Sequence, residues 1–409
     1  MYDILTHAVL RNRHSARGGK AAVAVVYAAA LFQGLTLVSF PASSAILKQM
    51  NGLSDSQYGA IFLPQVACAV LGALAGGSLV NRLGLVTIFV VTLLANGLSQ
   101  LLLAVSAAVP IGLAYPLILL GTAALGLGFG LGGGPLNSYP RLLFPTRGGS
   151  AILALHSVMG IGLTLGPLLV GYLAMRGYWL AFPLGLTVAC LALLGLSAGV
   201  GFPEDAPPLA AARAATIKPT SAPEFWLFLG IAAVYAFAEG TFSNWAVIYV
   251  HESRGFSDGV ATSSLAAFWA ALVVGRLLVS ALLLRIAPMV PWALLPILMI
   301  GAFLMLPIVA TPTSAILGFA LAGLACSAFF PLTVATASAR FPQAVAFIAS
   351  MLTAALMVGV GIASFVIGGL RDVLSLEQLY RASVIYPVLA LVLIGFVVRA
   401  IRLRTLSTS

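Results

Sequence analysis

Long apolar stretches and short polar gaps alternate along the whole chain. A helix needs about 20 apolar residues to cross about 30 Å of hydrocarbon, and twelve stretches reach that length. Because lipid offers the backbone no hydrogen-bonding partner, each span must be a helix or part of a closed barrel. The stretches are too long and too continuous for barrel strands, so the pattern predicts an all-α membrane protein. The expected spans are residues 21–47, 56–80, 85–108, 112–137, 149–174, 177–201, 223–250, 258–284, 289–310, 313–337, 344–370 and 382–398.

One longer polar gap divides the twelve spans into two groups of six. It begins with FPEDAPPLAAARAATIKPTS, which is rich in Pro and Ala and carries several charges. We therefore expect an N-terminal six-helix bundle over residues 1–201, a cytoplasmic linker over 202–222 and a C-terminal six-helix bundle over 223–409.

The two groups of spans repeat one another. The second span ends VLGALAGGSLVNRLG and the eighth ends VVGRLLVSALLLRIA; aligned without gaps, they pair Gly72 with Gly275 and Arg82 with Arg285. The fourth and tenth spans each contain Pro-Leu followed by Phe-Pro. Two similar halves indicate a pseudo-symmetric fold with a solute site at their interface, near the middle of the bilayer.

The composition agrees with lipid as the main solvent. Hydrophobic residues make up 61% of the chain and charged residues only 7%, against about 25% charged in soluble domains. The net charge of +10 does not indicate nucleic-acid binding, because the basic residues lie in short gaps between spans. The three cysteines lie inside apolar stretches without disulfide or metal-ligand spacing. We expect no metal and no cofactor.

The distribution of Lys and Arg predicts the orientation. If the N-terminus is cytoplasmic, fourteen of the twenty basic residues lie on the cytoplasmic side and five on the other, with Arg276 inside a span. An excess of positive charge marks cytoplasmic loops. We therefore expect a multi-pass protein of a bacterial inner (plasma) membrane with both termini in the cytoplasm.

Two motifs carry a resemblance to the major facilitator superfamily, which extends over essentially the whole chain. The loop GSLVNRLG resembles the superfamily's signature between spans two and three, with Asn81 at the usual Asp position followed by Arg82. The fifth span contains Gly162, Gly166 and Pro167, in a pattern similar to one common among exporters of the superfamily. The resemblance implies the twelve-helix major facilitator fold and a gating or conformational role for these five residues.

A finer resemblance is to the branch of fucose-permease-like and rhizopine-transporter-like proteins. It is carried by AEGTFSNWAVIYV with GRLLVSALLLRIAP and by LNSYPRLLFP with LHSVMGIG. The resemblance implies functional roles for Glu239, Arg276, Asn137 and His156. The acid of the first span in fucose-permease-like proteins is absent, and Gln33 is the polar residue available there.

Glu239 lies deep in the seventh span, where a charge costs from ~2.5 to over ~10 kcal/mol. The acid must therefore face water or a partner, or be protonated. An acid that takes up a proton on one side and releases it on the other couples transport to the proton gradient. The alternative is a carboxylate held by Arg276 or by a hydroxyl of a neighbouring helix.

Arg276 is the basic residue within a span, and His156 is expected at a similar depth in the fifth span. Arg276 is a candidate for binding the solute, with packing or the capping of carbonyl groups as the alternative. His156 is a candidate for relaying protons, with neutral hydrogen bonding as the alternative. Asn137, near the cytoplasmic end of the fourth span, is a candidate for a gate.

Polar and aromatic side chains near the acid are candidate contacts for the solute. Tyr235 lies on the same helical face as Glu239, and Trp245 and Tyr249 follow further along the span. Aromatic rings stack on sugars and on flat organic solutes. Gln33 and Asn244 are candidate hydrogen-bonding groups, with bonds between helices as the alternative.

These patterns together predict a proton-coupled secondary active transporter that moves a sugar or a similar polar metabolite by symport and alternating access. The alternatives are a proton-driven exporter of drug-like or metabolite compounds, and a uniporter. One Glu, one His and one Arg on three different spans do not form an enzyme's catalytic cluster. The expected partners are the small-molecule solute, protons and the lipid bilayer, with no nucleic acid, and we expect a monomer.

Overall fold

The computed structural model describes residues 2–203 and 219–407. Within them, twelve helices are long and apolar enough to cross a membrane. The prediction of an all-α protein with twelve spans is confirmed. The linker expected at 202–222 includes residues 204–218, which lie outside the described residues, so the division into two bundles stays a prediction.

The first six spans form what we call the N-terminal half. The first span is Gly19–Ala42 within a longer helix, and the second combines two consecutive helices over Asp55–Leu83. The helices of this half are α1 (Tyr2–Ala42), α2 (Ser44–Asn51), α3 (Asp55–Ala60), α4 (Phe62–Leu83), α5 (Leu85–Ser106), α6 (Ile111–Leu143), α7 (Gly148–Met175) and α8 (Ala181–Ala198).

The last six spans form the C-terminal half, which contains more interrupted helices. The seventh span is followed by a short helix and a π-helical turn, and the tenth is broken in its middle. The elements are η1 (Pro219–Ser221), α9 (Pro223–Asn244), α10 (Ala246–Ile248), η2 (Tyr249–Ser253), α11 (Asp258–Leu282), α12 (Met289–Met305), η3 (Leu306–Ile308), α13 (Pro312–Cys326), α14 (Phe329–Arg340), α15 (Val345–Leu370), α16 (Leu376–Ala382) and α17 (Ile385–Ser407).

The two halves use the same helix pairs. In the N-terminal half α4 and α5 pack on α6, and α1 packs on α7; in the C-terminal half α11 and α12 pack on α13, and α9 packs on α15. Between the halves, α7 packs on α11 and α4 packs on α15. The repeat in the sequence therefore corresponds to a repeat in packing, and each half contributes the same two helices to the interface.

Glycines allow the closest of these helix contacts. A Cβ on Gly126 of α6 would lie 1.9 Å from the carbonyl oxygen of Gln65 on α4, and one on Gly323 of α13 would lie 2.0 Å from that of Phe268 on α11. No side chain fits at such distances, so the glycine-rich stretch of the fourth span serves helix packing.

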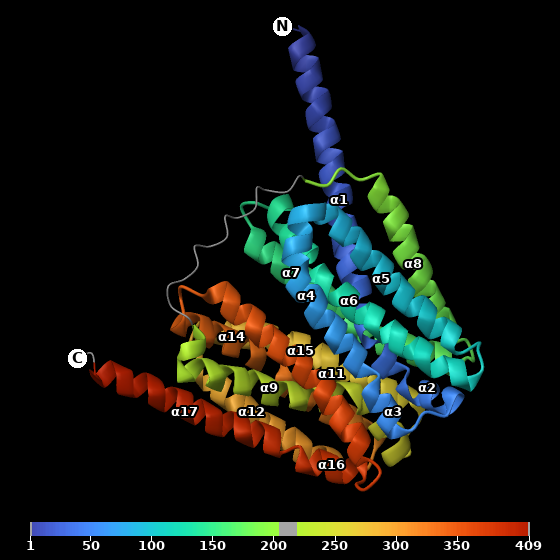
Figure 1. Cartoon of the computed structure of the whole chain (residues 1–409), viewed down its shortest axis with the longest axis vertical. Coiled ribbons are helices and arrows are strands. Elements are labelled where there is room, and N and C mark those ends of the chain that lie inside the picture. The colour runs from blue at the N-terminus through green and yellow to red at the C-terminus, as the bar shows by residue number, and fades with distance from the viewer. Residues whose placement is uncertain (1, 204–218, 408–409) are drawn as a thin grey trace.

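The two ends of the molecule differ in how close the halves are. Toward the start of α1 and the end of α17 the helices of the two halves diverge, and we call this the terminal end (Figure 1). Around α2, α3, η2 and α16 the halves converge, and we call this the sealed end (Figure 1).

Four charged side chains join the halves at the sealed end. The Lys48 ammonium lies 2.6 Å from an Asp55 carboxylate oxygen and 2.6 Å from one of Glu252, and the Arg371 Nε lies 3.0 Å from the second Asp55 oxygen. Lys48 and Asp55 belong to the N-terminal half, while Glu252 and Arg371 belong to the C-terminal half. We refer to these four residues as the sealed-end ion cluster.

Some expected span boundaries were wrong. The span expected at 21–47 stops at Ala42, where the separate helix α2 follows, and the span expected at 223–250 is interrupted at Trp245. The break after Ala42 and the interruption at Trp245 both lie at or near the sealed end, where the two halves come together. Apolar composition continues through these bends, so hydropathy does not reveal them.

Candidate functional site

Glu239 lies at the centre of the molecule. It is sixteen residues after the start of α9 at Pro223 and fourteen before the end of η2 at Ser253, so it lies midway along the interrupted seventh span. The side chain is partly exposed although its helix is mostly buried. An ionisable group this deep in a span is a candidate for carrying a proton.

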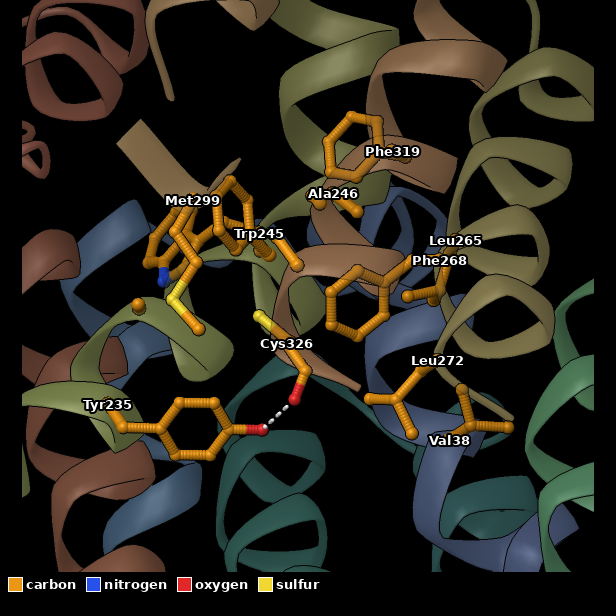
Figure 2. Packing of buried hydrophobic residues seen from close by; sticks show 14 of the residues in the cluster. Val38, Tyr235, Trp245, Ala246, Leu265, Phe268, Leu272, Met299, Phe319 and Cys326 are labelled. Carbon is orange, nitrogen blue, oxygen red and sulfur yellow. Dashed lines mark hydrogen bonds between the residues drawn. The ribbon is translucent and has the colours of Figure 1, made fainter. Parts of the chain in front are cut away.

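The Tyr235 hydroxyl is the hydrogen-bonding neighbour of this carboxyl group. It lies within hydrogen-bonding reach of Glu239 and donates to the Cys326 carbonyl oxygen at 2.9 Å, as Figure 2 shows. A phenol has a single proton to donate. While Tyr235 donates to Cys326, its oxygen is free to accept from a protonated Glu239. An ionised Glu239 competes with the Cys326 carbonyl oxygen for the Tyr235 hydroxyl proton.

Arg276 approaches the same place from α11. Its Nε donates to the Ser327 carbonyl oxygen at 2.9 Å, and the residue is exposed. Its charge interacts with Glu239 on α9 and with His156 on α7. Arg276 therefore lies close to ionisable groups of both halves. Arg276 and Glu239 are not within 4.0 Å of each other among the described ion pairs.

Pro331 explains why carbonyl groups are available to these two side chains. Proline has no backbone N–H, so the carbonyl four residues earlier, that of Ser327, loses its helical donor. The tenth span accordingly breaks between Cys326, the last residue of α13, and Phe329, the first of α14. Arg276 and Tyr235 bind the two adjacent carbonyl groups of this break.

His156 faces the same space from the N-terminal half. Its Nε2 lies 3.2 Å from the Asn137 Oδ1, while the Asn137 Nδ2 donates to the Gly133 carbonyl oxygen at 2.8 Å. Because the amide oxygen of Asn137 is an acceptor, the His156 Nε2 must carry the hydrogen. His156 is exposed, and its Nδ1 is free of hydrogen bonds among the described residues.

The remaining candidate contacts for the solute are buried in this conformation. Gln33 accepts a hydrogen bond from the Asn96 Nδ2 at 2.9 Å, and Asn244 donates to the Ser364 hydroxyl at 2.7 Å. Trp245 is fully buried and packs edge-on against Tyr58 with ring centroids 5.2 Å apart. These residues join helices here, and their contact with a solute stays a prediction.

Tyr249 lies away from the central group. Its ring stacks on Tyr380 with centroids 4.3 Å apart, and its hydroxyl donates to the Leu306 carbonyl oxygen at 2.8 Å. The residue is completely buried near the sealed end. The structure therefore brings Glu239, Tyr235, Arg276, His156 and Asn137 together, but places Tyr249 in a separate aromatic cluster.

The candidate gating residues fall into two groups. Asn81 and Arg82 are exposed at the terminal end of α4. Gly162 and Gly166 pack α7 on α1: a Cβ on the first would lie 2.3 Å from the Leu31 carbonyl oxygen, and one on the second 2.3 Å from the Val38 Cγ1. Pro167 follows inside α7. This motif joins helices within one half, so it preserves the shape of that half.

Sequence reasoning missed the Ser327 and Cys326 carbonyl groups and the sealed-end ion cluster. Pro331 was a usable signal, since a proline within a span predicts a carbonyl group without its donor. The ion cluster has no local signal, because its four members come from the ends of different spans.

Two repeated groups of six membrane-spanning helices, with ionisable side chains near the interface between them, are typical of secondary transporters. The chain belongs to the major facilitator superfamily: the family model described as Major Facilitator Superfamily matches residues 24–322. The expected superfamily resemblance is thereby confirmed, and the finer branch stays a prediction. No curated protein matches the sequence.

Solved structures show the same fold. The chain is similar to a mutant of the nucleoside transporter NupG, with TM-score 0.73, 13% identity and coverage of 92% of this chain and 99% of that one. The D-xylose-proton symporter gives TM-score 0.72, 16% identity and coverage of 92% and 96%. A bacterial homolog of the human lysosomal transporter Spinster, in an inward-facing and occupied conformation, gives a TM-score of 0.71 and 15% identity. The match covers 94% of this chain and 97% of that one.

Proposed function

We propose that this protein is a proton-coupled secondary transporter that moves a small polar organic solute by alternating access. The observation that carries the proposal is the partly exposed Glu239 at the middle of the molecule, beside Tyr235 and within the field of Arg276. We place the terminal end on the cytoplasmic side, because Lys and Arg are in excess in the segments at that end.

The energetics favour a single coupling group. One proton that crosses a potential of about 100 mV releases ~2.3 kcal/mol, which supports a solute gradient of about fiftyfold. Glu239 must alternate between a protonated and an ionised form for this coupling. A protonated Glu239 can donate to the Tyr235 oxygen, whereas an ionised Glu239 can accept the Tyr235 hydroxyl proton. Proton symport is also the activity named for the D-xylose-proton symporter, whose fold this chain shares.

Proteoliposomes loaded with the fluorescent pH indicator pyranine test the proposal. D-xylose, a nucleoside and a set of small organic acids are added one at a time, and acidification of the lumen reports proton entry with the solute. In Glu239→Gln, solute-dependent acidification should disappear while exchange of the same solute continues. Acidification at the wild-type rate in this variant would exclude Glu239 as the proton carrier.

Glu224→Gln is a matched control on the same helix. Glu224 accepts from the Arg340 guanidinium at 3.1 Å at the terminal end of the C-terminal half, away from the central space. We expect this variant to retain solute-dependent acidification. Solute entry without any acidification, in the wild type itself, would assign the protein to the uniporters.

A further inference from the structure

The guanidinium group of Arg276 has a free binding face. Only its Nε donates to a carbonyl group, that of Ser327. The two terminal NH2 groups make no hydrogen bond to any residue that the structure describes, although the residue is exposed. A guanidinium group is always charged, and its forked terminal nitrogens match the two oxygens of a carboxylate.

The surroundings of Arg276 lack a permanent neutralising partner. Glu239 interacts electrostatically with Arg276 but does not form a direct ion pair with it. His156 also interacts with Arg276 and would add a second positive charge if its ring were protonated. Tyr235 and Cys326 are the other ionisable groups beside Glu239, and both are ordinarily uncharged below about pH 8. In the part of α15 that the structure describes, no side chain is ionisable. When Glu239 takes up a proton, the site therefore holds a net positive charge.

We infer that Arg276 is an anion receptor and that the transported solute is a small organic carboxylate, which enters with the proton carried by Glu239. This inference rests on the proposed function. The carboxylate of the solute occupies the terminal nitrogens of Arg276 while Glu239 is protonated. Solute and proton then neutralise the site together, and each favours the binding of the other because an ionised Glu239 repels the anion.

His156 gives the anion a contact with the second half. Asn137 holds the His156 Nε2–H, so the free Nδ1 donates to the solute when the ring is protonated. A carboxylate between Arg276 and His156 would connect α11 of the C-terminal half with α7 of the N-terminal half. This bridge links the presence of the solute to closure of the terminal end.

Matched pairs of solutes test the inference on the full-length protein in detergent. Binding of lactate against lactamide, glucuronate against glucose, and benzoate against benzamide is measured by isothermal titration calorimetry at two pH values. The wild type should bind at least one carboxylate at least tenfold more tightly than its neutral partner, and more tightly at the lower pH. Equal binding of the members of every pair, or failure of all three carboxylates to bind, would overturn the inference.

Four variants assign the effect to individual residues. Arg276→Gln should lose the tenfold preference for the carboxylate, whereas Arg285→Gln, an exposed change just beyond the end of α11, should keep it. Glu239→Gln should lose the greater part of the pH dependence of carboxylate affinity, and adding His156→Gln should remove any remainder. If Glu239→Gln alone keeps the wild-type pH dependence and His156→Gln loses it, the cooperating proton is not on Glu239.

The two proposals fail in different ways. Proton entry that accompanies a neutral solute, and that Glu239→Gln abolishes, would retain the coupling role of Glu239 and overturn the assignment of a carboxylate. Carboxylate binding that depends on Arg276, together with proton entry that survives in Glu239→Gln, would retain the anion receptor and overturn the coupling role.

Discussion

The sealed end and the terminal end both contain ion pairs, but these pairs connect different things. At the sealed end, Lys48 binds Glu252 and Asp55 binds Arg371, and both contacts cross between the halves. At the terminal end, Glu224 binds Arg340 within the C-terminal half. Alternating access requires the ion pairs between the halves to break in every cycle, whereas an ion pair within one half can stay intact. The position of an ion pair relative to the halves therefore decides whether it controls conformation or only stability.

Backbone packing reinforces this difference. A Cβ on Gly59 of α3 would lie 2.5 Å from the Ser364 carbonyl oxygen of α15, and one on Gly368 would lie 2.6 Å from that of Asp55. The helices of the two halves thus touch through their backbones at the sealed end. At the terminal end, Arg82 is exposed in the last turn of α4.

The largest effect is expected from Gly59→Ala, which should force the sealed end apart. A new Cβ 2.5 Å from a backbone oxygen requires a helix to shift, and we expect the sealed conformation to lose more than about 1.4 kcal/mol, a tenfold change in population. Electron paramagnetic resonance distances between spin labels at positions 82 and 285 should shorten as the terminal end closes.

Gly77→Ala is the matched control for that measurement. A Cβ on Gly77 of α4 meets nothing within 4 Å, so the distance distribution should match that of the unmutated protein. An unchanged distribution in Gly59→Ala would show that backbone contact does not hold the sealed end together.

A smaller effect is expected from Lys48→Ala, which removes the centre of the sealed-end ion cluster. The side chains of Lys48, Asp55 and Glu252 are 13%, 17% and 31% exposed, so solvent screens the pairs only in part. We expect a destabilisation of the sealed conformation on the order of 1 kcal/mol, about a fivefold change in population. The same spin-label distances would measure it, and a distribution unaffected by the change would assign the cluster no role in sealing.

The smallest conformational effect is expected from Arg340→Gln. Its partner Glu224 is almost completely buried, and both residues belong to the C-terminal half. The variant should have a lower melting temperature because a buried carboxylate loses a partner. The distribution of spin-label distances should stay the same. A shift in that distribution would remove the distinction between the two kinds of ion pair.

The sequence alone predicted much of the fold and part of the site. Spans of about 20 apolar residues are local signals that led to the twelve helices, and the repeated Pro-Leu and Phe-Pro patterns led to the two related halves. Glu239, Arg276 and His156 stood out because ionisable groups are costly in lipid. The bonds of Arg276 and Tyr235 to the broken tenth span were not predicted.

Trp245 and Tyr249 show where reasoning along one helix is insufficient. Their spacing from Glu239 made them candidate solute contacts, yet Trp245 packs against Tyr58 of the other half and Tyr249 stacks on Tyr380. The interruption at Trp245 changes the direction of the residues that follow. A helical period predicts a common face only while the helix continues without a break.

The sequence by itself determined that the chain is a helical membrane protein built from two related halves, because hydropathy and lipid leave the backbone no other structure. Only the tertiary structure decided which charges meet. Lys48, Asp55, Glu252 and Arg371 are distant along the chain, and their pairing depends on how α2, α3, η2 and α15 converge. The physical reason is that burial acts on each residue individually, whereas an ion pair requires two residues to be placed within a few ångströms of each other.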